Sequence, residues 1–335
     1  MDGSAGQQST ADAAPGERGG SHERLPDFFV VGHAKSGTTA LHAMLAQHPQ
    51  VFLGLKEPRF FASELHVRDM PRPNTTPKTL DEYRAWFADA TPEQQIGDIS
   101  PDYLWSRDAA RLIAEACPDA RIIAILREPA SFLRSLHQQW LRHYVETETD
   151  FRKAIELEQP RRLGQQMPLS TYWPKALFYS EHVRYVEQLC RFHEYFPRDR
   201  VLVLIYDDYR RDNDATVRTV LRFLGVDETA PIAARRSNES VHVQSPRLHG
   251  ALRRLTVADS RSLALLKRSL TALTPMRVRQ RLLQTVRKRV VFGEPLPADE
   301  AFLIELRHRF KPEVAALSEY LGRDLVGLWG YDELD

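Results

Sequence analysis

The sequence predicts an α/β protein in which helices flank a central parallel sheet. Two near-continuous apolar runs, at residues 28–31 and 120–126, are typical of strands buried on both faces. The first run leads through a Gly-containing loop into apolar residues at helical spacing. The second ends just before Pro129, and proline suits the first position of a helix. The order of strand, loop and helix is the pattern of a parallel sheet covered by helices.

The two ends of the chain differ from its middle in composition. Residues 1–24 are rich in Gly, Ser, Ala, Gln and charge, so we expect a disordered leader there. The remaining 25–335 are long enough for a single large domain with a core. We expect its last part, 235–335, to be helical and basic.

Charge and cysteine content exclude several classes of protein. Lys and Arg number 46 against 45 Asp and Glu, so no overall field favours nucleic acid. No apolar run is long enough to span a bilayer. The two cysteines, Cys117 and Cys190, fall in separate predicted helical segments, which favours reduced thiols over a disulfide framework. We therefore expect a soluble, cytoplasmic protein.

The first strand runs directly into a candidate phosphate-binding loop. Unpartnered N–H groups and the dipole of the following helix attract phosphate, and Gly32 and Gly37 permit close backbone approach. Lys35 supplies positive charge, and hydroxyls follow it in the loop. The Walker A pattern fails because Lys35 precedes the second glycine. The alternative is a plain strand-to-helix turn with an incidental lysine. The hydroxyl-bearing residues are Ser36, Thr38 and Thr39.

Next along the chain, Lys56 and Glu57 precede two adjacent aromatic residues. Glu57 near the phosphate loop is a candidate general base, whereas a surface ion pair is the commoner meaning of adjacent Lys and Glu. Residues 64–95 are an expected insertion that shapes the mouth of the pocket. Within it, Thr79 is predicted to cap a helix over 80–88.

The ends of two later strands carry further candidate site residues. Asp98 and Ser100 end a short strand on the side where open α/β sheets bind ligands, although Asp98 is equally suited to cap the next turn. Arg127 ends the strand 120–126, where a nucleotide kinase carries an acidic residue that holds Mg²⁺. Arginine suits phosphate and cannot bind a metal. Ser135 lies about two helical turns further on. Alternatively, this pair is a capping arginine and an ordinary helix serine.

These motifs together resemble the sulfotransferases that use 3′-phosphoadenosine 5′-phosphosulfate (PAPS). The resemblance implies the P-loop-like sulfotransferase fold. It places Lys35 and residues 36–39 at the 5′-phosphosulfate, and Arg127 and Ser135 at the 3′-phosphate. Residues 201–208 resemble the family's last core strand, which adds Tyr206 to the expected cofactor site.

Two segments resemble the heparan-sulfate sulfotransferase branch and its bacterial relatives. Residues 57–61 match a Glu-x-x-Phe-Phe segment, which implies that Glu57 is the catalytic base, and 98–104 match an acidic-Lys-Ser/Thr-Pro-x-Tyr segment. This chain has Ile99 where that branch has lysine, so one positive charge is missing near the transferring group. The branch's Lys-Gly-Arg loop against the 3′-phosphate has no clean counterpart, and Arg247 is the candidate substitute.

Three segments complete the chain. We expect 151–175 to be a loop bordering the acceptor pocket, 177–196 to be one helix, and 298–321 to be a final helix closed by Gly322. The basic amphipathic segment 253–289 suits an anionic membrane surface, an anionic acceptor, or a solvated helix face near the cofactor.

The resemblance therefore implies transfer of the sulfuryl group from PAPS, with PAP as product and no metal, onto a hydroxyl or amine of a small-molecule, lipid or carbohydrate acceptor. Two alternatives remain: a kinase that uses ATP and Mg²⁺, and an inactive nucleotide-binding module. The sequence identifies neither the acceptor nor the oligomeric state.

Overall fold

The computed structural model describes residues 24–65, 76–143, 145–168, 171, 173–233, 242–243, 292–293 and 299–334. Most of the predicted leader, the candidate Arg247, residues 235–240 and the basic segment 253–289 lie outside the described residues. Within them, no helix is long and apolar enough to cross a membrane.

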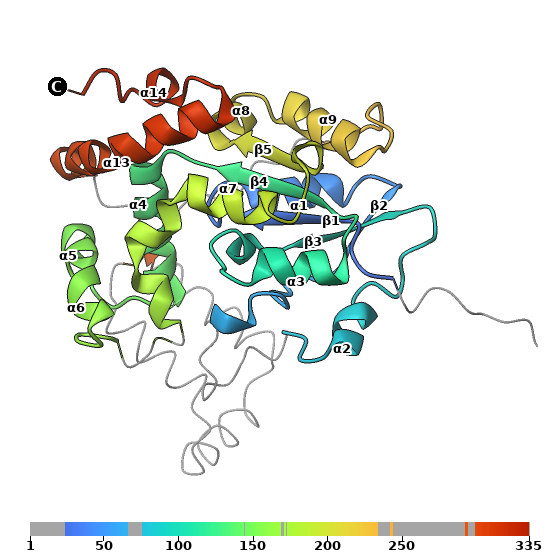
Figure 1. Ribbon diagram of the computed structural model, residues 1–335, viewed down its shortest axis with the longest axis horizontal. Helices are drawn as coiled ribbons and strands as arrows, with labels where there is room; N and C mark the ends of the chain where they lie inside the picture. The colour runs from blue at the N-terminus through green and yellow to red at the C-terminus, as the bar shows by residue number, and fades with distance from the viewer. Residues whose placement is uncertain are drawn as a thin grey trace, which may run out of the picture.

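A five-stranded, all-parallel sheet forms the centre of the molecule (Figure 1). Its strand order is β2-β3-β1-β4-β5, so the first strand of the chain lies in the middle. The strands are β1 (Phe28–Gly32), β2 (Val51–Leu53), β3 (Gln95–Ile99), β4 (Arg121–Leu126) and β5 (Val201–Ile205). The predicted fold class, an α/β fold with helices around a parallel sheet, is confirmed. A separate antiparallel pair joins β6 (His242–Val243) to β7 (Phe292–Gly293).

Helices cover both faces of the sheet, because successive residues of each central strand point to opposite sides. Phe28 and Val30 pack with α1 (Thr38–Leu45) and α9 (Asn213–Leu224) on one face. Phe29 and Val31 belong to the larger core on the other face. The helices on that face include α3 (Ala109–Ala116), α4 (Pro129–His143), α7 (Tyr185–His193) and α13 (Glu300–Leu321).

The remaining described elements are short. The other α-helices are α2 (Leu80–Ala85), α5 (Phe151–Glu156), α6 (Glu158–Arg162), α8 (Tyr206–Arg211) and α14 (Leu325–Leu328). Five 3₁₀ helices lie at Ser63–Leu65, Pro101–Tyr103, Pro174–Leu177, Tyr179–Val183 and Arg198–Arg200. Both cysteines are free, as the sequence predicted.

Capping residues fix several helix ends where the sequence placed them. Thr79 accepts a hydrogen bond from the main-chain N–H of Glu82, although α2 ends at Ala85 rather than near residue 88. The final helix ends at Gly322, whose φ of 60° is the left-handed conformation that favours glycine. These local signals were sufficient because the cap and its partner lie within one turn of each other.

Two secondary-structure predictions were wrong. The helix predicted over 177–196 is divided: 3₁₀ turns precede α7, because Phe178 and Arg184 have non-helical backbones. Long-range hydrogen bonds hold this break, since Tyr179 donates to Glu146 and the main-chain N–H of Ser180 donates to Glu158. The loop predicted over 151–175 begins with the helices α5 and α6, the first of them capped by Asp150.

Candidate active site

The loop after β1 has the shape of an anion-binding turn. Lys35 and Gly37 both lie in the left-handed region, with φ of 64° and 90°. A Cβ atom on Gly37 would lie 2.7 Å from the ring of Tyr209, so the close approach requires glycine as well. The loop then enters α1, whose first N–H groups have no partners within the helix. The hydroxyl of buried Ser36 has no hydrogen-bond partner among the described residues.

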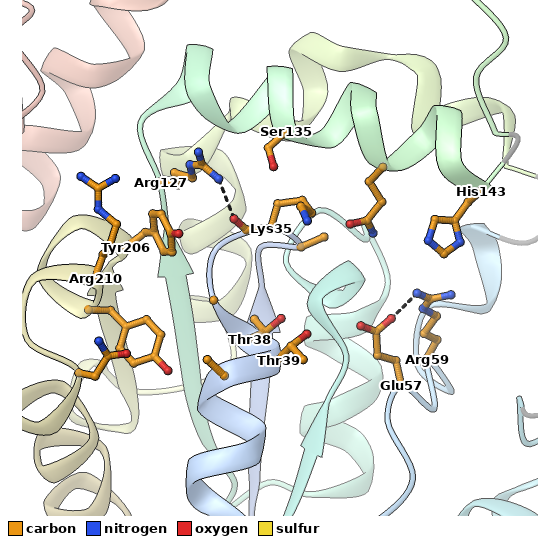
Figure 2. A pocket seen from close by; sticks show the side chains of 16 residues that line it. Lys35, Thr38, Thr39, Glu57, Arg59, Arg127, Ser135, His143, Tyr206 and Arg210 are labelled. Atoms are coloured by element: carbon orange, nitrogen blue, oxygen red, sulfur yellow. Dashed lines mark hydrogen bonds and ion pairs between the residues drawn. The ribbon is translucent and has the colours of Figure 1, made fainter. Parts of the chain in front are cut away.

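This loop opens into a cavity of about 600 Å³ at the carboxyl ends of the strands (Figure 2). Of the predicted site residues, the cavity brings together Lys35, Gly37, Thr38, Thr39, Glu57, Arg127, Ser135 and Tyr206. Ser36 lies in the loop without lining the cavity, and Arg247 lies outside the described residues. The sequence therefore predicted half of the residues that line the cavity.

The charges that line the cavity favour an anionic ligand. Among the described residues that line the cavity, one side chain is a carboxylate, that of Glu57. Four are cationic: Lys35, Arg59, Arg127 and Arg210. Burial lowers the pKa of Lys35, and the nearby Arg142 and Arg127 guanidiniums lower it further. Because like charges crowd Lys35, a phosphate or sulfate group bound there would relieve repulsion as well as form hydrogen bonds.

Arg127 joins the loop to the end of β4. Its Nη1 donates to the main-chain oxygen of Lys35 at 2.9 Å, and its Nε donates to the hydroxyl of Ser131 at 3.2 Å. Its guanidinium carbon lies 4.9 Å from the ring centroid of Tyr206, within cation–π range. Figure 2 shows Ser135 above Lys35, extending from α4 toward the same space. Arg127 at the end of β4, Ser135 on α4 and Tyr206 at the start of α8 thus come together at one site.

Glu57 lies at the other end of the cavity and has two cationic partners. Its carboxylate pairs with Arg59 (Figure 2), and Lys56 Nζ lies 3.8 Å from its Oε1. Arg59 is itself held by Asp102, 2.7 Å away, and its guanidinium lies 4.7 Å from the centroid of a Trp173 ring. Glu57 is therefore ion-paired and also lines the cavity, and its role as a general base stays a prediction.

Lys56 links the Glu57 segment to the phosphate loop. Its Nζ donates to Thr39 Oγ1 at 2.8 Å, and burial lowers its pKa while Glu57 raises it. This chain has Ile99 where the heparan-sulfate sulfotransferase branch has a lysine. Lys56 is a different cation, and it contacts the phosphate loop from the segment that carries Glu57. No feature of the sequence predicted this contact.

Asp98 has neither of the roles that the sequence left open. It is buried, and its carboxylate accepts hydrogen bonds from Tyr83, Tyr103 and Ser100 at 2.7–2.8 Å. Burial raises its pKa to about 6. Ser100 Oγ in turn accepts from the main-chain N–H of Arg59 at 3.0 Å. Asp98 and Ser100 therefore support the segment that carries Glu57 and do not line the cavity.

Several residues that line the cavity were missed. Gln139 and His143 follow Ser135 at intervals of four along α4, so helical spacing could have identified them. Burial, and then the neighbouring Arg142, lower the pKa of His143 to about 4, which leaves the imidazole neutral at pH 7. The remaining missed residues are Ala34, Ala40, Arg59, Tyr209, Arg210 and Asn213.

Part of the chain is similar in sequence to curated proteins. The chain is 27% identical over 210 residues to the mouse bifunctional heparan sulfate N-deacetylase/N-sulfotransferase 4, covering 61% of this chain and 23% of the relative. It is 28% identical over 127 residues to the human heparan sulfate glucosamine 3-O-sulfotransferase 3B1, covering 37% of this chain and 29% of the relative. The chain thus spans about a quarter of the length of the curated relatives that it matches.

A solved structure supports the fold. The crystal structure of a sulfotransferase from Alicyclobacillus acidocaldarius superposes with a TM-score of 0.63 at 23% identity, covering 91% of this chain and 98% of that one. Residues 26–230, which carry the phosphate loop, Glu57, Arg127, Ser135 and Tyr206, match the sequence model of the Sulfotransferase family. The chain therefore belongs to the sulfotransferase family.

Proposed function

We propose that this protein transfers the sulfuryl group of PAPS to a hydroxyl or amine of an acceptor. The observation that carries the proposal is that two anion-binding groups open into one cavity. Lys35 with its loop is the first, and Arg127 with Ser135 is the second. A nucleotide that bears phosphates at both its 5′ and 3′ ends would use both groups at once.

The residues present suit such a donor. Lys35, Ser36, Gly37, Thr38 and Thr39 would hold the 5′-phosphosulfate, and Arg127 with Ser135 would hold the 3′-phosphate. Tyr206, at cation–π distance from Arg127, offers an aromatic surface beside the nucleotide. When bound, PAPS supplies a sulfuryl group attached to a phosphate leaving group.

Glu57 would act as the general base on the acceptor. Lys56 and Arg59 pair with its carboxylate in the ionised form, which is the form that accepts a proton. Lys35 and the loop amides would stabilise negative charge on the leaving phosphate oxygen, and stabilisation of such charge is typically the largest catalytic term. Lys56, held on Thr39, adds positive charge from the side of the cavity that carries the base.

The acceptor we propose is a carbohydrate, because the curated relatives are named for heparan sulfate. The described lining at the Glu57 end supports a polar acceptor, since Arg59, Gln139 and His143 are all polar. Small-molecule and lipid acceptors remain alternatives. The expected cytoplasmic location and the single domain over 25–335 stay predictions.

Transfer of labelled sulfate from PAPS to a panel of carbohydrate, lipid and small-molecule acceptors tests the proposal, with Lys35→Ala as the inactive control. Calorimetry complements it: we expect PAP to bind without metal and more tightly than ATP with Mg²⁺. Binding of ATP with Mg²⁺ and no binding of PAP would favour a kinase instead. Tight binding of PAP without transfer to any acceptor would favour an inactive nucleotide-binding module.

A further inference from the structure

Acidic residues directly follow two of the residues that face the proposed 3′-phosphate site. Glu128 comes after Arg127, and Asp207 and Asp208 come after Tyr206. Glu128 and Asp207 lie close enough to raise the pKa of Arg127, although burial lowers it by more. A carboxylate that turned toward Arg127 would form an ion pair with the guanidinium and compete with a phosphate for it.

All three carboxylates are instead held by one segment near the end of the chain, residues 323–331, which we call the C-terminal segment. The Tyr331 hydroxyl donates to Glu128 Oε1 at 2.6 Å, and Trp329 Nε1 donates to Asp207 Oδ2 at 2.9 Å. A third contact joins Arg323 to Asp208 at 2.6 Å. The segment therefore contacts the acidic neighbours of both Arg127 and Tyr206.

The C-terminal segment is itself firmly placed. Asp324 caps α14 by accepting a hydrogen bond from the main-chain N–H of Gly327, and Leu325, Trp329 and Tyr331 are buried in the larger core. In Figure 1, α13 and α14 lie together at the top of the view, near α4 and α8. Helix α4 follows Arg127 in the sequence, and helix α8 begins at Tyr206. This part of the chain lies beyond the residues that match the family.

The partners of the Arg127 side chain are correspondingly neutral. Its two hydrogen bonds go to the main-chain oxygen of Lys35 and the hydroxyl of Ser131. Across the described ranges, no carboxylate forms an ion pair with it. Glu128, its sequence neighbour, accepts from the N–H groups of Ala130 and Ser131 and from Tyr331. The donors from Trp329 and Tyr331 are uncharged, and Arg307 on α13 adds a cation 3.8 Å from Glu128 Oε1.

We propose that the C-terminal segment is a positioning element that holds Glu128 and Asp207 away from Arg127 and so reserves this guanidinium for the 3′-phosphate of the nucleotide. The inference rests on the proposed function. It assigns to Trp329 and Tyr331 an effect on nucleotide recognition, although neither residue lines the cavity.

The test compares two nucleotides by calorimetry. PAP and adenosine 5′-monophosphate (AMP) share the adenosine and the 5′-phosphate, but AMP lacks the 3′-phosphate. We expect Trp329→Phe combined with Tyr331→Phe to weaken PAP binding about tenfold and to leave AMP binding unchanged. Tyr320→Phe removes a hydroxyl on α13, outside the C-terminal segment, where the Arg198 guanidinium lies over the ring, and should change neither affinity.

A rescue variant separates positioning from packing. Trp329→Phe alone frees Asp207, and adding Asp207→Asn removes the competing charge, so PAP affinity should return to the wild-type value. Equal losses for PAP and AMP, or no rescue by Asp207→Asn, would overturn the inference. If the wild-type protein does not bind PAP, the proposed function is wrong. That outcome differs from one in which the wild type binds PAP and only the effect of the C-terminal segment is missing.

Discussion

The guanidinium of Arg127 donates a 2.9 Å hydrogen bond to the main-chain oxygen of Lys35, whose backbone lies in the left-handed region. The two residues are 92 positions apart in the sequence, yet the bond ties the end of β4 to the phosphate loop. Each half of the proposed nucleotide site therefore helps to shape the other half.

Replacing Arg127 with lysine tests this coupling. Lysine keeps the charge but loses the planar fork, so it cannot contact Lys35, Ser131 and a phosphate together. We expect PAP affinity to fall by about 2 kcal/mol, or roughly thirtyfold, as is typical of lost hydrogen bonds to charged groups. Calorimetry measures the change, and Arg121→Lys at the opposite end of β4 is the matched control. Equal PAP affinities for the Arg127 variant and the wild type would contradict the coupling.

Lys35→Ala should nearly abolish transfer. The lysine faces charge that increases as the leaving group departs, and losing such a contact costs about 3–4 kcal/mol in the transition state, a factor of hundreds or more. Initial rates of labelled-sulfate transfer measure the loss. Lys153→Ala on α5, outside the cavity, should remain fully active. A Lys35 variant that retained a tenth of wild-type turnover would contradict this role.

Glu57→Gln should separate catalysis from cofactor binding. Glutamine preserves the shape of the side chain but cannot accept the acceptor's proton, so we expect kcat to fall by about 10²–10⁴-fold, the usual contribution of a general base. PAP affinity should stay close to that of the wild type, since Glu57 lies at the end of the cavity opposite Arg127 (Figure 2). Normal turnover in this variant would show that another group accepts the proton.

Lys56→Met removes the charge that contacts both Thr39 and Glu57. We expect kcat to fall about tenfold, corresponding to roughly 1.4 kcal/mol, with a smaller effect on PAP affinity. Steady-state kinetics at saturating PAPS measure the drop, and Lys56→Arg should recover part of it. Unchanged kcat in Lys56→Met would show that this charge does not assist the transfer.

Asp98 should give the protein a characteristic dependence of stability on pH. Its pKa is about 6 in the folded protein and 3.8 in the reference state, so the folded state binds the extra proton between these values. The stabilisation from this proton is fully present below about pH 4 and is lost as pH rises through 6. Denaturant unfolding from pH 4 to 7 should show the wild type losing stability relative to Asp98→Asn. Parallel pH curves for the two proteins would contradict the assignment.

Half of the residues that line the cavity could be predicted from the sequence because their signals are local. A buried strand, a glycine-containing loop with Lys35, and the spacing of Ser135 from Arg127 all lie within short stretches of chain. Parallel strands then bring their carboxyl ends to one edge of the sheet, so separate motifs converge without further information.

Helical spacing along α4 could have identified Gln139 and His143, whereas other features that were missed depend on contacts between distant residues. The broken helix at Tyr179 follows from a hydrogen bond to Glu146, and the burial of Asp98 follows from hydroxyls on Tyr83 and Tyr103. No pattern near Asp207 indicates that Trp329 holds it, since 122 positions separate them. Propensity and spacing describe one segment at a time, and tertiary hydrogen bonds override them.

The geometry of α4 has a practical consequence for engineering. Ser135, Gln139 and His143 line the cavity from successive turns of α4. The helical rise of 1.5 Å per residue separates Ser135 from His143 by about 12 Å along the helix axis. Under the proposed function, we expect diversification of position 143 to change acceptor preference and to leave nucleotide affinity unchanged. A library built there could retarget the enzyme without rebuilding its donor pocket.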